Sequence, residues 1–268
     1  MKKNILIISV TSDIGFSLAQ KWLNDGHNVM GTYRSRDENF IKLNTTNIHL
    51  EHLDISNKID IDNFIENIKK HTLKWDTLIM CPATMHPIGM FEKIDFDKWK
   101  DTININFTSQ MELIHKLLPY KNKEVISSIL LFAGSGTNST ADNYSAYTIS
   151  KIASIKMVEL LDSEINDSKF MIYGPGWVKT KIHQETLDSK DTVEDHYHTT
   201  LKKLEDNDCT PINTVIESIE WGINLPKKII GGRNISVVFD KWGQKRLEEE
   251  LEKNPHMYKL RRYGNDWE

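Results

Sequence analysis

The feature that most constrains the fold of this chain is a regular alternation of short apolar segments with longer amphipathic ones. Residues 4–10 read NILIISV, an apolar and largely β-branched run typical of a strand buried on both faces. A helical pattern follows over 16–24, closed by Gly26, and a second strand is predicted over 29–32. Repeated strand–helix units of this kind fold into a parallel sheet with helices on both faces. The pattern therefore predicts a doubly wound α/β fold.

The alternation continues through most of the chain, with one interruption. The remaining strands are predicted over 48–53, 75–80, 127–133, 169–173 and 235–239. The remaining helices are predicted over 59–71, 96–118 (capped near Asp95 or Asp97), 212–225 and 244–251, with a further helix that carries Tyr147 and runs to about Leu161. The polar stretch 180–210 breaks the pattern, and we interpret it as a lid over the strand ends or, alternatively, as a solvated helical surface. We expect residues 1–240 to form one domain and residues 241–268, which include Leu260-Arg261-Arg262-Tyr263, to form a tail that docks on it or on a partner subunit.

Composition excludes several classes of protein. A net charge of −4 over 268 residues argues against nucleic-acid binding. The two cysteines, Cys81 and Cys209, lie too far apart for a disulfide framework or a metal motif, which is typical of a reducing cytoplasm. The pair His196 and His198 lacks further ligands at metal-binding spacing, so no metal site is expected. No apolar run reaches the roughly 20 residues of a membrane span, and the apolar start is too short for a signal peptide.

Tyr147 and Lys151 are spaced to lie on one face of a helix, one turn apart. A nearby ammonium favours a phenolate, so this pairing is expected to lower the tyrosine pKa from its usual value of about 10. A phenol tuned in this way is a general acid or base for alcohol and carbonyl chemistry. The spacing alone also fits an exposed amphipathic pair, so the rest of the chain must decide.

The turn after the first strand, Thr11-Ser12-Asp13-Ile14-Gly15, is short and polar and opens a helix. Backbone N–H groups at such a helix start can face a pyrophosphate. The strict G-x-G-x-x-G pattern is absent, and an ordinary capped turn is the alternative.

Taken together, these features resemble the short-chain dehydrogenase/reductase family of the classical, shorter type, over about residues 4–239. The resemblance is carried by Tyr147-x-x-x-Lys151, by Pro175-Gly176-Trp177-Val178-Lys179-Thr180, and by Trp99 followed by Asn104-Ile105-Asn106. It implies a Rossmann-like fold with a nicotinamide dinucleotide as cofactor.

The resemblance also implies a catalytic set. Tyr147 would exchange a proton with the substrate oxygen, and Lys151 would lower its pKa and hold the nicotinamide ribose. Ser135 would donate a hydrogen bond to the reacting oxygen, with Ser139 as a second candidate. Asn106 would support a proton relay, although Asn104 is close enough in sequence to compete for that role.

The implied cofactor residues include two departures from the family pattern. Ser9 and Asp13 stand where glycines are usual, and only Gly15 remains; serine is small enough for close approach, whereas Asp13 is expected to cap the helix or turn aside. Cys81-Pro82-Ala83-Thr84 replaces the family's Asn-Asn-Ala-Gly, and we interpret Cys81 as a packing residue. The expected cofactor-binding residues are Ser9, Thr11, Ser12, Asp13, Ile14, Arg34, Asp54, Ile55, Ala83, Tyr147, Lys151, Pro175, Gly176, Val178 and Thr180.

The end of the second strand bears on cofactor choice. A carboxylate there would select NAD, but the first charged residue is Arg34, with Arg36 nearby. A guanidinium favours a 2′-phosphate, so the sequence favours NADP(H) over NAD unless both arginines are simply solvated.

The sequence thus predicts an NADP(H)-dependent oxidoreductase that interconverts a carbonyl and a secondary alcohol. Trp177, Tyr144 and His183 suggest a polar substrate such as a sugar derivative, and the resemblance implies a homodimer or homotetramer. One alternative is a catalytically inactive dinucleotide-binding sensor or scaffold of the same fold, motivated by the altered glycine turn. Another is a nucleotide-sugar epimerase or dehydratase of the extended type, for which the chain leaves little room. We expect neither nucleic acid nor a membrane as a partner.

Overall fold

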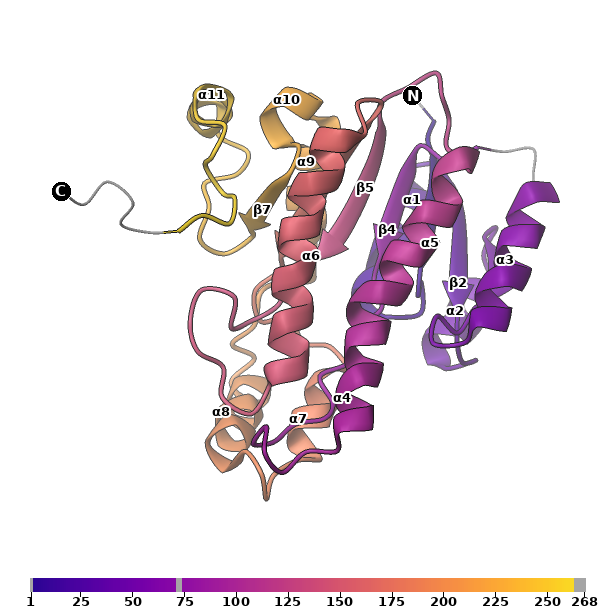
Figure 1. The fold of residues 1–268 in the computed structure, drawn as a ribbon. Coiled ribbons are helices and arrows are strands. Elements are labelled where there is room, and N and C mark those ends of the chain that lie inside the picture. The colour runs from indigo at the N-terminus through magenta and orange to yellow at the C-terminus, as the bar shows by residue number, and fades with distance from the viewer. Residues whose placement is uncertain (1, 71–73, 263–268) are drawn as a thin grey trace.

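The computed structural model describes residues 2–70 and 74–262, and its centre is one seven-stranded parallel sheet of order β3-β2-β1-β4-β5-β6-β7 (Figure 1). From β1 to β3 the chain adds strands toward one edge of the sheet, and from β4 to β7 it adds them toward the other edge. This order confirms the predicted doubly wound sheet. The strands are β1 (Asn4–Ile8), β2 (Asn28–Tyr33), β3 (His49–His52), β4 (Thr77–Met80), β5 (Ser127–Phe132), β6 (Ser168–Gly174) and β7 (Arg233–Ser236).

Helices connect and cover these strands. They are α1 (Asp13–Asn24), α2 (Glu38–Asn44), α3 (Lys58–Lys70), α4 (Phe96–Ile103), α5 (Ser109–Leu117), α6 (Ser145–Glu164), α7 (His183–Leu187), α8 (Glu194–Glu205), α9 (Ile212–Asn224), α10 (Lys227–Ile230) and α11 (Lys245–Lys253). A π-helical turn, η1 (Asn104–Thr108), joins α4 to α5, and a short 3₁₀ turn, η2 (Leu118–Tyr120), follows α5.

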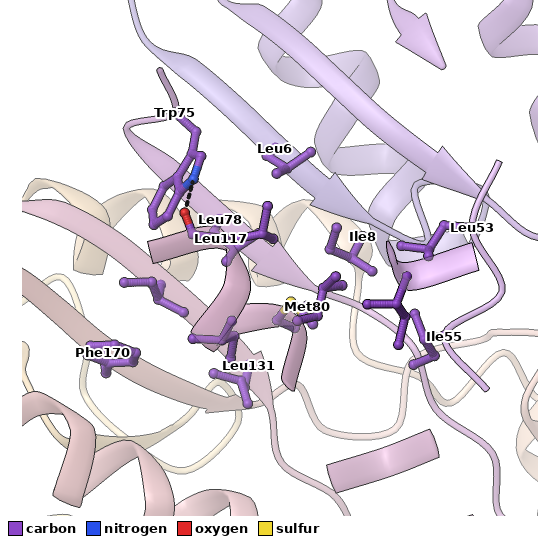
Figure 2. Packing of buried hydrophobic residues seen from close by; sticks show 14 of the residues in the cluster. Leu6, Ile8, Leu53, Ile55, Trp75, Leu78, Met80, Leu117, Leu131 and Phe170 are labelled. Carbon is purple, nitrogen blue, oxygen red and sulfur yellow. Dashed lines mark hydrogen bonds between the residues drawn. The ribbon is translucent and has the colours of Figure 1, made fainter. Parts of the chain in front are cut away.

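Two apolar layers hold the sheet between its helices, because alternate side chains of each buried strand point to opposite faces. On one face, Leu6 and Ile8 of β1 pack with α3, α5 and α6. Figure 2 shows this layer, where the Trp75 ring nitrogen also donates to the Leu117 carbonyl at 3.2 Å. On the other face, Ile5 and Ile7 pack with α1 and α9. Both faces of β1 are therefore buried, as its continuous apolar sequence predicted.

Several element boundaries differ from the sequence predictions. The last strand is Arg233–Ser236, so the expectation of 235–239 was wrong; the backbone turns after Ser236, whose N–H donates to the Asp240 carboxylate at 2.7 Å. The predicted single helix over 96–118 is interrupted by η1. Helices α2 and α10 were not predicted. The last residue of the predicted helix 59–71 lies outside the described residues.

The lid segment contains α7 and α8, which lie beyond the carboxyl ends of the strands (Figure 1). In open α/β sheets this is the end at which ligands bind.

The described part of the tail packs on the domain. Leu247 and Leu251 of α11 form a small apolar cluster with Ile229. Buried Arg233 donates to the carbonyl of Leu251 in α11 and to the carbonyls of Asn254 and Met257, which follow the helix. Tyr263, which the sequence singled out, lies outside the described residues.

Candidate active site

A cavity of about 1370 Å³ runs along the carboxyl ends of the strands, from the turn after β1 to the start of α6. All the expected cofactor residues line it, and so does the expected serine donor. They are Ser9, Thr11, Ser12, Asp13, Ile14, Arg34, Asp54, Ile55, Ala83, Ser135, Tyr147, Lys151, Pro175, Gly176, Val178 and Thr180. Asn106 does not line the cavity. Residues distant in sequence are thus brought to one cleft.

The turn after β1 keeps a glycine-type geometry although it carries Ser9. This serine adopts a φ of 59°, in the left-handed region that glycine favours. A Cβ at Gly15 would lie 2.7 Å from the Ser9 carbonyl oxygen and 2.8 Å from Ser12 Oγ, so only glycine fits there. Ser12 Oγ accepts a hydrogen bond from the Gly15 N–H at 3.2 Å and caps α1.

Asp13 does not cap the helix that it begins; it turns aside, which was one of the two outcomes expected for it. Its Oδ2 accepts a hydrogen bond from the Lys181 backbone N–H at 2.6 Å, and its Oδ1 accepts one from Asn39 Nδ2 at 3.4 Å. The carboxylate is therefore held by the lid and by α2.

At the end of β2, Arg34 and Arg36 have different surroundings. Arg34 is exposed and lines the cavity, whereas Arg36 is absent from the lining and its guanidinium lies 5.5 Å from the Phe40 ring centroid. Of these two arginines, only Arg34 is placed to meet a ligand in the cleft.

Tyr147 and Lys151 lie one turn apart on α6, and both are largely buried at the cavity wall. Lys151 Nζ donates to the Phe132 carbonyl at the end of β5 at 3.0 Å and lies 5.6 Å from the Tyr147 ring centroid. Residue 134 must be glycine, because a Cβ there would collide with the Tyr147 hydroxyl. This close packing fixes where the phenol points.

Burial dominates the pKa values of this pair. Burial and, to a smaller extent, the nearby Glu185 carboxylate raise the pKa of Tyr147 to about 12. Burial also lowers the pKa of Lys151 to about 8. The expectation of a lowered tyrosine pKa was therefore wrong for this structure, because loss of solvation on burial disfavours the charged phenolate.

Asn106 sits in η1, where its amide pairs with the backbone of Thr84. Thr84 N–H donates to Asn106 Oδ1 at 2.9 Å, and Asn106 Nδ2 donates to the Thr84 carbonyl at 2.8 Å and to Ser150 Oγ at 3.2 Å. Asn104, its competitor in the sequence, is exposed. Asn106 therefore does not line the cavity itself but holds in place the loop after β4, which does.

The lid reaches the same loop through Glu185, a residue that sequence reasoning did not single out. Its carboxylate accepts hydrogen bonds from the N–H of Met85 at 2.5 Å, the N–H of His86 at 3.1 Å and the Thr84 hydroxyl at 3.1 Å. Lys181 contacts the opposite end of the cleft. The sequence predicted a lid but not these two contacts, because neither Lys181 nor Glu185 belongs to a recognisable motif.

Cys81 and the aromatic side chains that the sequence singled out also lie in this region. Burial raises the pKa of the Cys81 thiol to about 12, so it is protonated at neutral pH and suited to packing rather than to nucleophilic attack. Trp177 stacks on His183 with ring centroids 3.9 Å apart, and the Tyr144 hydroxyl lies 3.1 Å from Thr186 Oγ1.

These residues fit a dinucleotide. The tight turn, with no space for a side chain at Gly15, allows a pyrophosphate to approach the start of α1. At the other end, the buried Lys151 ammonium has one acceptor, Phe132 O, which leaves N–H groups for ligand hydroxyls. Within residues 2–70 and 74–262, no three histidine, cysteine or acidic side chains gather as a metal site requires, and no helix is long and apolar enough to cross a membrane.

Comparison with known proteins agrees with this geometry. The sequence profile of the family described as short chain dehydrogenase matches residues 3–191. A 3-ketodihydrosphingosine reductase of Bacteroides thetaiotaomicron is 25% identical over 249 residues, covering 88% of this chain and 90% of its own. A short chain dehydrogenase/reductase of Saccharomyces cerevisiae has a TM-score of 0.77 at 21% identity, covering 92% and 98% of the two chains. A Shigella flexneri short chain dehydrogenase solved with NADP has a TM-score of 0.73 at 16% identity, covering 88% and 96%.

Proposed function

Because this chain belongs to the short chain dehydrogenase family, we propose that it transfers hydride between NADP(H) and a carbonyl or secondary alcohol. The observation that carries the proposal is the pair on α6: Tyr147 and Lys151 are buried together at the wall of a cleft that extends to a dinucleotide-type turn. A protein that only binds a nucleotide has no need of a buried phenol and ammonium at that position.

Each group of the chain has a definite task in this reaction. The Tyr147 hydroxyl gives its proton to the carbonyl oxygen in reduction and takes a proton back in oxidation. Lys151, held by the Phe132 carbonyl, binds ribose hydroxyls and stabilises the phenolate. Ser135 donates to the reacting oxygen, and Asn106 keeps the loop after β4 in place beside it. The bound nicotinamide supplies or accepts the hydride.

The preference for NADP(H) rests on Arg34. Its exposed guanidinium lines the cavity beyond the end of β2, where the adenosine ribose of a dinucleotide would lie. A guanidinium pairs strongly with a phosphate dianion and has no such partner in NAD(H).

We propose a hydroxylated substrate such as a sugar derivative. The cleft lining includes the His183 ring, stacked on Trp177, and the Glu185 carboxylate, which lies near Tyr147; both are polar groups suited to substrate hydroxyls. The Bacteroides relative is named for a 3-ketosphingoid substrate, so long-chain amino ketones are the competing class.

The assembly and the location of the protein remain predictions. Helices α4 and α6 pack together beside the site, and we propose that the protein pairs through this side as a homodimer or homotetramer in the cytoplasm. The tail from residue 241 is proposed to dock on the domain, which the contacts of Arg233 support.

The test is a titration with NADPH and NADH followed by nicotinamide fluorescence, with a screen of carbonyl substrates from both classes. We expect tighter binding of NADPH, turnover of at least one ketone, and about tenfold weaker NADPH binding in Arg34→Gln with NADH unchanged. Arg36→Gln is the matched control and should bind as wild type does. Binding without any turnover would favour the alternative, an inactive dinucleotide-binding protein; no binding of either cofactor would contradict both.

A further inference from the structure

The lid residue Lys181 joins two acidic residues across the cofactor end of the cavity. Its backbone N–H donates to Asp13 at 2.6 Å, and its ammonium lies 2.6 Å from Asp37 Oδ2. Asp13 is the first residue of α1, and Asp37 caps α2 through the Phe40 N–H. The lid is therefore tied to the two helices that follow β1 and β2, at the place where the phosphates of a dinucleotide would lie.

The charges at this end of the cleft do not suit a polyanion unless Lys181 takes part. Asp13 and Asp37 both line the cavity, and Arg34 is the cation beside them at the end of β2. A dinucleotide brings further negative charge, from its pyrophosphate and, in NADP(H), from its 2′-phosphate. With Lys181 included, Asp13 and Asp37 are matched by two cations, Arg34 and Lys181, which reduces the repulsion that the phosphates would meet.

The Lys181 ammonium can exchange the Asp37 carboxylate for another anion. The Lys181 side chain is 58% exposed and that of Asp37 is 31% exposed, so water screens the pair and it contributes little to stability. The 2′-phosphate of NADP(H) carries more charge and more acceptor oxygens than a carboxylate, and the two phosphates of the pyrophosphate together carry two charges, so either group competes well for an ammonium. Asp37 meanwhile keeps a second role as the cap of α2, so its side chain stays in place if Lys181 leaves.

We propose that Lys181 is a phosphate-binding residue of the cofactor site. Its ammonium leaves Asp37 and pairs with a phosphate of the entering dinucleotide, while its N–H bond to Asp13 keeps the lid segment over the cleft. The inference rests on the proposed use of a dinucleotide and deepens it by naming a cationic partner contributed by the lid. Both the pyrophosphate and the 2′-phosphate offer the same chemistry to an ammonium.

The experiment measures dissociation constants for NADPH and NADH at low and at moderate salt, for wild type, Lys181→Gln and Lys179→Gln. Lys179 is exposed, lies two residues away and does not line the cavity, so it makes a control with the same loss of charge. We expect Lys181→Gln to weaken binding about five- to tenfold at low salt and less at higher salt. Lys179→Gln should bind as wild type does.

Comparing the two cofactors shows which phosphate Lys181 binds, because only NADP(H) carries a 2′-phosphate. A loss confined to NADPH assigns Lys181 to the 2′-phosphate, and an equal loss for both cofactors assigns it to the pyrophosphate. Equal dissociation constants for Lys181→Gln and wild type would overturn the inference. If wild type itself binds neither cofactor, it is the proposed function that fails, and the two failures are thereby distinguished.

A second variant tests the exchange itself. Asp37→Asn keeps a capping side chain but removes the carboxylate charge. We expect it to tighten NADPH binding several-fold when Lys181 is present and much less when Lys181→Gln is added. An equal gain in both backgrounds would show that Asp37 only repels the cofactor, and it would contradict an exchange of Lys181 between them.

Discussion

At the scale of single residues, Ser9 holds a backbone conformation that glycine adopts more readily. Its φ of 59° costs an L-residue about 1 kcal/mol or more, and no side-chain hydrogen bond from Ser9 offsets that cost among the described residues. We expect Ser9→Gly to stabilise the protein by about 1 kcal/mol and to raise Tm by roughly 2–4 °C in thermal unfolding. Ser139→Gly, at a position with ordinary φ, should not stabilise; a destabilised Ser9→Gly would show that the serine side chain matters to the turn.

Glu185 sets a second expectation at this scale. Its carboxylate raises the pKa of Tyr147, so neutralising it should lower that pKa and make the phenolate available at lower pH. For alcohol oxidation, which needs the phenolate, we therefore expect the rise of activity with pH to occur at lower pH in Glu185→Gln than in wild type. The glutamine oxygen can still accept from the N–H groups of Met85 and His86. A profile that shifts upward, or does not move, would contradict the electrostatic role of Glu185.

The sequence could predict Tyr147 and Lys151 because their spacing carries a chemical reason, and the structure places both at the cavity wall. It could not predict Lys181 and Glu185, because their importance arises from contacts with residues about 100 or more positions away. The sequence also could not predict the direction in which the Tyr147 pKa shifts, since this depends on how deeply the phenol is buried.

At the scale of elements, η1 turns what reads as one helix into two and aims Asn106 at the loop after β4. Asn106→Ala would leave the N–H and carbonyl of Thr84 without their partner, so we expect a loss of about 2–3 kcal/mol in the free energy of unfolding. Asn104→Ala, in the same turn but exposed, should change it by less than about 0.5 kcal/mol. Equal effects in denaturant titrations would contradict the assignment.

The contact between the tail and α6 predicts a pH dependence. Arg261 donates to both carboxylate oxygens of Glu159, at 2.9 and 2.6 Å, and with Lys156 it lowers the pKa of Glu159 to about 2. A depressed carboxyl pKa stabilises the fold above its ordinary value of 4.5, and this contribution is lost as pH falls toward about 2. We expect Arg261→Gln to cost about 1 kcal/mol near pH 6, with a gap to wild type that closes between pH 4.5 and 2. Neighbouring Arg262→Gln is the control, and a gap independent of pH would contradict this contact.

Element types were largely predictable from the sequence and element boundaries less so, for physical reasons. Strands such as β1 are apolar on both faces, which leaves few other folds open to them. The end of the last strand was predicted too late because Val237 and Val238 have side chains that favour strands. In the structure the Ser236 N–H donates to the Asp240 carboxylate, and the backbone forms a turn after Ser236. Helix α2 has only seven residues, too few to show a helical period, so the capping residue Asp37 was its only signal.

At the scale of the whole molecule, the doubly wound sheet brings distant loops to one edge. The turn after β1, the end of β2, the start of α6 and the lid all meet there, and they form one continuous cleft. The lid contacts both ends of this cleft, through Lys181 at the start of α1 and through Glu185 at the loop after β4. This arrangement suits a reaction in which a dinucleotide and a second ligand must meet away from water.

The central claim is that the buried phenol of Tyr147 moves the proton that accompanies hydride transfer. The most direct test compares wild type with Tyr147→Phe in two assays on the same samples: binding of NADPH by fluorescence, and reduction of a ketone found by screening. We expect the variant to bind NADPH within about twofold of wild type while its kcat falls by a factor of about 100 or more. Retention of most of the wild-type kcat in a variant that still binds NADPH would contradict it.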